Sequence, residues 1–570
     1  MPSIRPYAWR ILPLLFLLAL YWPGLTNWFY QDDFGWLNLR RGVHSVADLA
    51  PALFAPKAHG NMRPLGENAY FLILSSIFGV DALPFRICAF ATQMASLLLL
   101  GCIAARITAS RAAGFWAQAL WIANTGLAPA MCWTSIYNQL LSGFFFLLAL
   151  YFFQRNIESG GTRFAAAHWI AFVLSLGALE TNVMYPAIAA AYALLFARPY
   201  VKKILPMFLV SALAVAIHFH FAPPPAAGLY APRLDGRIFA TLWSYWMLAW
   251  GPWHVGAWLL TVAAVVFALR HKIGLFGLVW FVLVLCPYLP LAEHKMDYYL
   301  AVPVVGLAIL GAGAITLLRM PWKVIAVGCI AAYLAASVPA ARAIAVWNHE
   351  RGTRVEDLVL GVADIHAAQP GKTILLDNVD DELFTAGIVD VPFRVMEIPR
   401  VYLTPGYEDR VKYALPQALA LSELNEGRAV VYRVDGSTLR NVTGNYRATV
   451  AAAWKPETPR FINLGDSIYG RYLGAGWDAP ADGYRLLRAS ATVRIGGPKT
   501  TDERLYVGVF RTRDVHLAAR VNGVDVHPQI VERTGELTEF AVSLPAAPEI
   551  EVTLTNGSPE PLRFGFLELR

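Results

Sequence analysis

Two adjacent carboxylates, Asp32 and Asp33, follow the first long apolar stretch of the chain and lie among the aromatic residues of segment 28–36. Such a pair is costly at the edge of an apolar environment, because desolvation disfavours each charge and the two charges repel each other. The pair suits general base catalysis, in which one carboxylate accepts the proton of an attacking hydroxyl and the other orients it or a cationic partner. The alternative is a helix N-cap ahead of 34–39.

The composition of the whole chain indicates a membrane protein. Of the 570 residues, 57% are hydrophobic and 15% are charged, and the mean hydropathy is +0.46. Soluble domains carry roughly a quarter charged residues, so the deficit points to a bilayer as solvent. The net charge of +7 comes from Lys and Arg between apolar runs. That placement is typical of cytoplasmic loops, and we expect no nucleic acid among the partners.

Apolar runs near the roughly 20 residues that a helix needs to cross a bilayer fill the first part of the chain. We predict about eleven spans, at 8–26, 84–105, 111–128, 135–154, 164–180, 183–197, 202–221, 253–270, 273–290, 298–318 and 322–340. The run 8–26 lacks a signal-peptide cleavage site and is interpreted as a retained helix. Stretches 65–80 and 238–250 are predicted to be helices at the outer surface. Either could instead be a span, and counting only one would reverse the side of the tail.

Basic residues in short loops predict the orientation. They precede the first span and recur in every second loop, at Arg5, Arg10, Arg106, Arg111, Arg155, Arg163, Arg198, Lys202, Lys203, Arg270, Lys272, Arg319 and Lys323. All of these loops lie on one side if the N-terminus is cytoplasmic. We therefore predict a multi-pass protein of the cell (inner) membrane. The acidic pair would lie outside, and so would the C-terminal domain, which would be periplasmic or extracellular.

Apolar runs end near Trp347, which suggests a division into domains. We predict a transmembrane catalytic domain at 1–345 with an outer loop at 26–83. An external mixed α/β segment would follow at 346–457, and an external β-sandwich-like domain at 458–570. All five cysteines precede this tail, so it would have no disulfides or zinc site.

Local patterns predict the elements of the tail. A helix at 354–368 and a strand at 373–377 would open the α/β segment. Short alternating runs separated by turn residues predict the strands of the sandwich, at 485–495, 504–510, 516–521, 538–542, 550–554 and 562–569. Four aromatic residues of this domain could stack on a sugar: Tyr469, Tyr472, Trp477 and Tyr484. The favoured alternative is that they pack the sandwich or its seam with the membrane domain.

Residues 8–350 resemble the GT-C superfamily of integral-membrane glycosyltransferases, in particular protein mannosyltransferases and aminoarabinose transferases. The motifs that carry the resemblance are Tyr-Gln-Asp-Asp-Phe at 30–34, Asn-Met-Arg-Pro-Leu at 61–65, the segment 78–86, Leu-Pro at 289–290, the segment 298–303 and Trp347. The resemblance implies inverting transfer of a sugar from a polyprenyl-phosphate carrier. It also makes Asp32 the candidate base and Asp33 its catalytic neighbour.

A lipid-phosphate donor would need cationic partners on the outer side, and Arg supplies forked donors that match phosphate oxygens. The candidates are Arg63, Arg86, His294 and Lys295, with headgroup contact or helix anchoring as the alternative for each.

Three further acids are candidates for the site. Glu180 falls where relatives carry an acid, although Leu179 replaces the base that often precedes it. Glu293 and Asp297 are equally well explained by capping of the following helix. No metal site is evident, so no cofactor is required, although carboxylates could hold a divalent metal.

Other classes of protein remain open. A transporter or flippase of lipid-linked glycans would show internal repeats or broken helices, and none is convincing here. A headgroup phosphotransferase would carry a nucleophile with a metal cluster in the tail. A non-enzymatic glycan-binding membrane protein would leave the acidic pair unexplained. We therefore predict a hexosyl- or pentosyltransferase embedded in the lipid bilayer, with a glycan, lipid or protein acceptor.

Overall fold

The computed structural model describes residues 8–56, 61–225, 228–252, 256–407, 410–454, 457–481, 483–510, 515–533 and 537–570. The chain divides into two compact units, Met1–Glu356 and Asp357–Arg570. The boundary between the units falls within the long helix α16 (Trp322–Ala368). The finer division of the tail at residue 457 stays a prediction.

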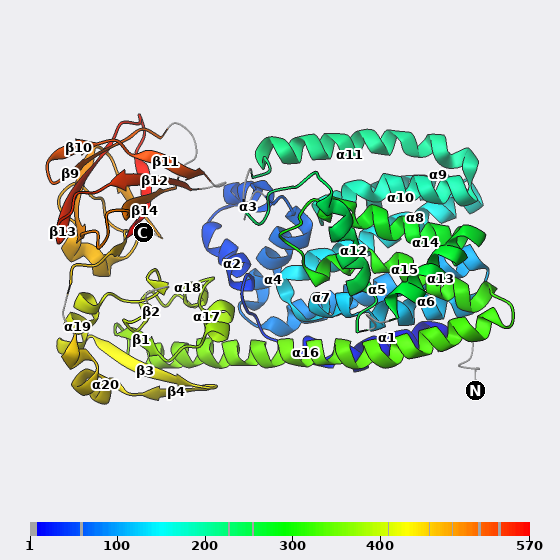
Figure 1. Ribbon diagram of the computed structural model, residues 1–570, viewed down its shortest axis with the longest axis horizontal. Helices are drawn as coiled ribbons and strands as arrows, with labels where there is room; N and C mark the ends of the chain where they lie inside the picture. Colours follow the sequence, from blue (N-terminus) through cyan, green and yellow to red (C-terminus); the bar gives the residue numbers. More distant parts are fainter. Residues whose placement is uncertain are drawn as a thin grey trace. The chain divides into compact units, whose positions relative to one another are not determined.

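Each predicted apolar run overlaps an α-helix that begins in the first unit (Figure 1). These helices are α1 (Ala8–Leu25), α5 (Ala82–Thr108), α6 (Arg111–Ala123), α8 (Tyr137–Ser159), α9 (Thr162–Leu176), α10 (Tyr185–Phe196), α11 (Val201–Phe221), α13 (Ala257–Arg270), α14 (Lys272–Leu285), α15 (Val304–Leu317) and α16. Among the residues that the structure describes, four helical stretches, which include α5, α8, α11 and α16, are long and apolar enough to cross a membrane. Arg5 and the start of run 253–270 lie outside the described residues.

Shorter helices occupy the stretches predicted to lie at the surface. The stretch 65–80 forms a π-helix, η4 (Pro64–Ala69), followed by α4 (Tyr70–Phe78), and 238–250 forms α12 (Arg237–Ala249). In Figure 1, α4 lies at one end of the helix bundle with α2 (Asp33–Leu37) and α3 (Leu49–Phe54). The loop that contains the acidic pair is therefore folded onto this end.

Loops predicted to share a side of the membrane lie together. At one end, the Leu65 N–H donates to the Gly177 carbonyl at 2.9 Å, and the Arg233 N–H donates to the Pro290 carbonyl at 2.8 Å. At a loop predicted to be cytoplasmic, Arg106 pairs with Glu158 at 3.2 Å. These contacts agree with the predicted alternation of the loops, and the orientation in the membrane stays a prediction.

The predicted helix 354–368 is not a separate element. It is the last part of α16, which has 47 residues and would be about 70 Å long. Along its first half, the Arg342 guanidinium donates to the carbonyls of Ala19 and Leu20 at 3.1 and 3.0 Å, so α16 lies along α1 (Figure 1). The intervening residues 341–353 contain no proline and are rich in alanine and arginine, which favour an unbroken helix.

The second unit opens with a mixed four-stranded sheet in the order β2-β1-β3-β4. Strand β1 (Thr373–Asp377) pairs in parallel with β2 (Val401–Leu403) and β3 (Ala429–Asp435). Strand β4 (Thr438–Asn441) returns antiparallel to β3. The helices that accompany this sheet are α17 (Asp381–Gly387), α18 (Pro392–Val395), α19 (Gln417–Asn425) and α20 (Thr443–Thr449).

A β-sandwich follows, as predicted. One sheet has the order β10-β9-β13-β7 and the other β11-β12-β8-β14-β5, with β6 beside β14. The strands are β5 (Phe461–Asn463), β6 (Arg485–Leu487), β7 (Ser490–Gly496), β8 (Arg504–Val509), β9 (Leu517–Val521), β10 (Val524–Val526), β11 (Gln529–Arg533), β12 (Thr538–Ser543), β13 (Glu549–Asn556) and β14 (Leu562–Leu569). The run 485–495 is two strands instead of one, and each pairs in a different sheet.

Two of the candidate sugar-stacking aromatics belong to the sandwich interior. Tyr469 is 1% exposed and joins the core cluster. The Trp477 indole donates to the Thr492 carbonyl at 2.8 Å and packs edge-on against Phe564. For both residues the geometry matches the packing alternative.

Candidate functional site

Asp33 is a fully buried carboxylate that ties the loop after α1 to the turn before α8. Its Oδ2 accepts a hydrogen bond from the Tyr30 N–H at 3.1 Å. Its Oδ1 accepts from the N–H and the hydroxyl of Ser135, at 2.7 and 2.5 Å. Burial raises the pKa of Asp33 to about 7, although these hydrogen bonds and the charge of Arg86 lower it. The side chain is 0% exposed, so Asp33 is suited to positioning the loop and not to contacting a substrate.

Asp32 has the opposite environment, because its side chain is exposed. It occupies the N-cap position of α2, but its carboxylate makes no capping hydrogen bond. Only its backbone carbonyl takes part in the helix, where it accepts from the Trp36 N–H at 3.2 Å. The acidic pair is thus divided into one buried, anchored acid and one exposed acid.

The aromatic residues around the pair hold the loop against other elements. The Tyr30 hydroxyl donates to the Asn348 side chain of α16 at 2.6 Å, and the Tyr30 ring stacks on Trp133 with centroids 5.7 Å apart. Trp133 in turn packs edge-on against Tyr298, at 6.2 Å. The loop that carries Asp32 is therefore supported by α16, by the turn before α8 and by the segment before α15.

A second charged cluster joins Arg63 to two acids. The Arg63 guanidinium pairs with Glu67 of the π-helix and, at 2.8 Å, with Glu180 of the short turn η7 (Glu180–Met184). Burial opposes the charge of Glu180, but Arg63 outweighs that effect and holds the pKa of Glu180 below its usual range. Burial raises the pKa of Glu67, which is 2% exposed. Arg63 is thus fixed in place by carboxylates on two sides.

The two clusters belong to one hydrogen-bonded network. The Asn138 amide donates to Glu67 and, at 3.3 Å, to the carbonyl of Ser135, whose N–H and hydroxyl bind Asp33. The short segment 135–138 therefore connects the acidic pair to the Arg63 cluster. A displacement of either cluster would be transmitted to the other through these buried bonds.

Two tyrosines lie within the electrostatic reach of both clusters. Burial raises the pKa of Tyr298 and of Tyr230; the negative charge of Asp32 raises it further, and the positive charge of Arg63 lowers it. Tyr230 also stacks against His294, with centroids 4.3 Å apart. Tyr230 therefore contacts His294 and, like Tyr298, lies within the electrostatic reach of Asp32 and Arg63, three of the residues predicted from sequence.

Arg86 lies elsewhere in the same end of the bundle. It is fully buried, and its guanidinium donates to the carbonyls of Gly24 and Met131 and to the Thr134 hydroxyl. These internal hydrogen bonds occupy all three of its nitrogens. The phosphate-binding role predicted for Arg86 stays a prediction.

The remaining candidates lie on the exposed segment before α15. Lys295 and Glu293 are exposed, and Glu293 lies 3.7 Å from the Arg237 guanidinium. Asp297 begins a 3₁₀ turn, and its carboxylate accepts a hydrogen bond from the Tyr298 N–H at 2.9 Å. It does not occupy the N-cap of this turn or of α15, which begins at Val304. Within the described ranges, no group of three or more His, Cys, Asp or Glu side chains could hold a metal ion.

Glu67, Ser135 and Asn138 are members of the network that the sequence analysis did not select. Glu67 could have been found, because it lies four residues after Arg63, the spacing that places opposite charges together on a helix. Ser135 and Asn138 carry no local signal of this kind, because their partners Asp33 and Glu67 lie far away in the sequence.

Comparisons with known proteins give similarity at the level of structure only. No family model matches the chain, and no curated protein matches it. The chain is similar to ArnT from Cupriavidus metallidurans, solved bound to undecaprenyl phosphate, with 12% identity and a TM-score of 0.42 over 94% of this chain and 98% of that chain. It is also similar to the arabinosyltransferase EmbB from Mycobacterium smegmatis, with 11% identity and a TM-score of 0.35. That match covers 99% of this chain and 64% of EmbB.

Proposed function

We propose that this chain is a membrane glycosyltransferase that moves a sugar from a polyprenyl-phosphate carrier to an acceptor on the outer face of the cell membrane. The observation that carries the proposal is the division of the acidic pair. Asp33 is buried and held by three donors, whereas Asp32 is exposed, and its charge reaches Tyr230 and Tyr298, as does the charge of Arg63. The polyprenyl carrier comes from the resemblance of the sequence motifs.

In the proposed reaction Asp32 accepts the proton of an acceptor hydroxyl as its oxygen attacks the anomeric carbon of the donor. A new carbon–oxygen bond forms on one face of the sugar, and the bond to the phosphate oxygen breaks on the other. The phosphate leaves with the electron pair, and the anomeric configuration is inverted. One carboxylate suffices as base for this step, which fits a pair in which only one member is accessible.

The leaving phosphate needs positive charge near it. Lys295 and His294 lie on the segment before α15, and His294 contacts Tyr230, which lies near Asp32. Arg63 already faces Glu67 and Glu180, so its charge is largely balanced. We therefore assign Arg63 mainly to holding the site together, and we assign phosphate contact to Lys295 and His294.

A comparison of cells with and without the protein tests the function. Loss of a transferase should cause its polyprenyl-phosphate sugar to accumulate and one sugar to disappear from a surface glycan, lipid or protein. Mass spectrometry of extracted lipids and of surface glycans would detect both changes and identify the sugar. Unchanged lipid-linked sugars together with unchanged surface glycans would contradict the proposal.

A further inference from the structure

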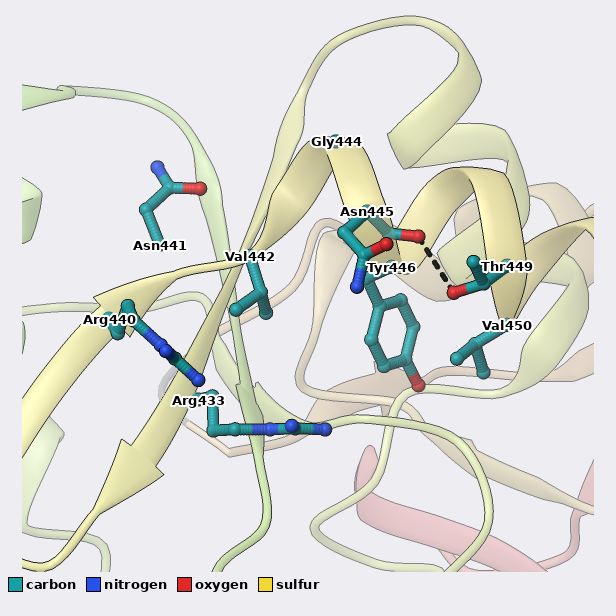
Figure 2. A pocket seen from close by; sticks show the side chains of 9 residues that line it. All are labelled: Arg433, Arg440, Asn441, Val442, Gly444, Asn445, Tyr446, Thr449 and Val450. Atoms are coloured by element: carbon teal, nitrogen blue, oxygen red, sulfur yellow. Dashed lines mark hydrogen bonds between the residues drawn. The ribbon is translucent and has the colours of Figure 1, made fainter.

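A pocket of about 440 Å³ lies in the mixed sheet domain of the C-terminal unit (Figure 2). In Figure 2, Arg433 and Arg440 enter it from the two strands of the β3–β4 hairpin, and Asn445, Tyr446 and Val450 enter from α20 and the residue that follows it. This volume falls in the range of small-molecule sites, roughly 300–1,000 Å³. None of the aromatic residues considered for sugar stacking lines it.

The pocket is lined by β3, by the edge strand β4 and by the segment that follows β4, and residues at the ends of β1 and β2 lie next to that lining. Arg433 is paired in register with Asp377, the last residue of β1, and Thr404 follows the last residue of β2. The Thr404 hydroxyl donates to Asp377 at 3.4 Å, and Tyr446 lies near enough for Asp377 to raise its pKa, after burial as the larger cause.

The charges that face the pocket are balanced. Arg433 and Arg440 lie directly opposite each other on β3 and β4, an arrangement that is unfavourable for two like charges. Each is compensated by an acid, because Arg433 pairs with Asp377 at 3.0 Å and Arg440 pairs with Asp435 at 3.3 Å. The guanidinium groups are therefore held as oriented donors with little net charge, which favours an uncharged ligand over an anion.

The remaining lining groups combine amides with apolar surface. The exposed Asn445 amide makes no hydrogen bond with any part of the chain that the structure describes, whereas the Asn441 oxygen accepts from Thr443. Beside these polar groups lie the ring of Tyr446 and the side chain of Val450, which is 42% exposed. Tyr446 is 6% exposed and packs into the core, so the apolar surface open to a ligand comes mainly from Val450. Planar donor and acceptor groups next to this exposed aliphatic side chain match the hydroxyl rim and the C–H face of a sugar ring.

We propose that this pocket binds an uncharged saccharide unit of a glycan. The proposal does not depend on the transferase function, because no residue of the Asp32 or Arg63 cluster takes part in it. The probes are neutral disaccharides and oligosaccharides on a printed array, with uronic-acid and phosphorylated saccharides on the same array. The full-length protein in detergent is applied, and the affinity for the best neutral saccharide is then measured by calorimetry.

Two variants disrupt the pocket in different ways. Arg440→Gln removes oriented donors from a mostly exposed side chain, and Gly444→Trp fills the pocket at a position where an added Cβ meets no atom within 4 Å. Each should weaken binding of the neutral saccharide by about tenfold or more. Matched controls are Arg520→Gln, which breaks a similar exposed Arg–Asp pair in the β9–β10 hairpin, and Gly470→Trp, where an added Cβ also meets nothing. Both controls should bind normally.

Salt separates hydrogen-bonded recognition from recognition of charge. Binding of a neutral saccharide should change less than about twofold between roughly 0.05 and 0.5 M NaCl, because screening acts on charges. Selective, salt-sensitive retention of uronic-acid or phosphorylated saccharides would overturn the proposal of an uncharged ligand. Failure to retain any saccharide, or normal binding by Arg440→Gln and Gly444→Trp, would overturn the site. Release of donor phosphate should be the same in all of these variants.

Discussion

At Asp33 two physical effects act in opposite directions. Burial removes water from the carboxylate and raises its pKa, whereas three donated hydrogen bonds favour the ionised form. The balance gives a pKa of about 7, so the protonation of this anchor changes within the physiological pH range. The exposed neighbour, Asp32, is held in place by the anchor without sharing its desolvation.

The raised pKa of Asp33 predicts a pH-dependent stability. Because the folded state holds this proton more tightly than the unfolded state, the stability that the proton contributes is fully present below the unfolded pKa, near 3.8. It is lost as pH rises through about 7. Asp33→Asn cannot titrate, so the wild-type melting temperature should fall relative to that of the variant between about pH 5 and pH 8. A constant difference over that interval would contradict the raised pKa.

Removing Arg63 should destabilise the protein, because Glu67 and Glu180 would then face each other without a cation. We expect Arg63→Gln to lower the free energy of unfolding by about 2 kcal/mol or more. The double variant Arg63→Gln/Glu67→Gln should be more stable than the single one, since one of the two unpaired acids is gone. Arg237→Gln, which breaks an exposed pair, is the control and should change little. Thermal unfolding in detergent measures the stability of all three variants. Additive effects of the substitutions at Arg63 and Glu67 would contradict the coupling between these two residues.

The π-helix η4 is the element that brings Arg63 and Glu67 to the turn that carries Glu180. Its approach to that turn is very close at Gly66, where an added Cβ would lie 2.2 Å from the Ala178 carbonyl oxygen. Gly66→Ala should therefore push η4 away and lower both the melting temperature and the transfer rate. Gly35→Ala is the matched control in the same loop, because a Cβ there meets nothing within 4 Å. Equal behaviour of the two variants would show that the close packing is unimportant.

The sequence predicted the helices and strands whose signals lie within their own segments of the chain. Apolar length and charged loops indicated the helices of the bundle, and turn residues between alternating runs indicated most strands of the sandwich. The continuity of α16 was not predicted, because the apolar run ends at residue 340 and the helix 354–368 was expected as a separate element. Gly352, which lies between these two parts, packs against Asn27, where a Cβ would not fit. In the site, the resemblance pointed to Asp32 as the base, but the burial of Asp33 and the exposure of Asp32 could not be predicted from the sequence. Their difference depends on Ser135, a partner 102 residues away from Asp33.

The whole molecule must place the acidic pair and the tail on the outer side for the proposed reaction to occur there. We test this with single cysteines in a protein from which the five native cysteines have been removed. Val524→Cys lies on an exposed strand of the tail, and Ser159→Cys lies in a loop predicted to be cytoplasmic. A membrane-impermeant thiol reagent should label the first in intact spheroplasts and the second only after permeabilisation. Reversed labelling would contradict the orientation and the outer-leaflet donor.

The most direct test of the account is the transfer rate of Asp32→Asn. The amide keeps the size of the side chain but cannot accept the acceptor proton, so release of polyprenyl phosphate from the lipid-linked sugar should fall by about 10²-fold or more. Asp81→Asn, which alters an exposed helix-capping acid before α5, should keep the wild-type rate. The purified proteins are compared with the lipid-linked sugar identified in cells, and their melting temperatures are matched first. A folded Asp32→Asn protein with near-normal turnover would contradict the central claim that Asp32 is the base.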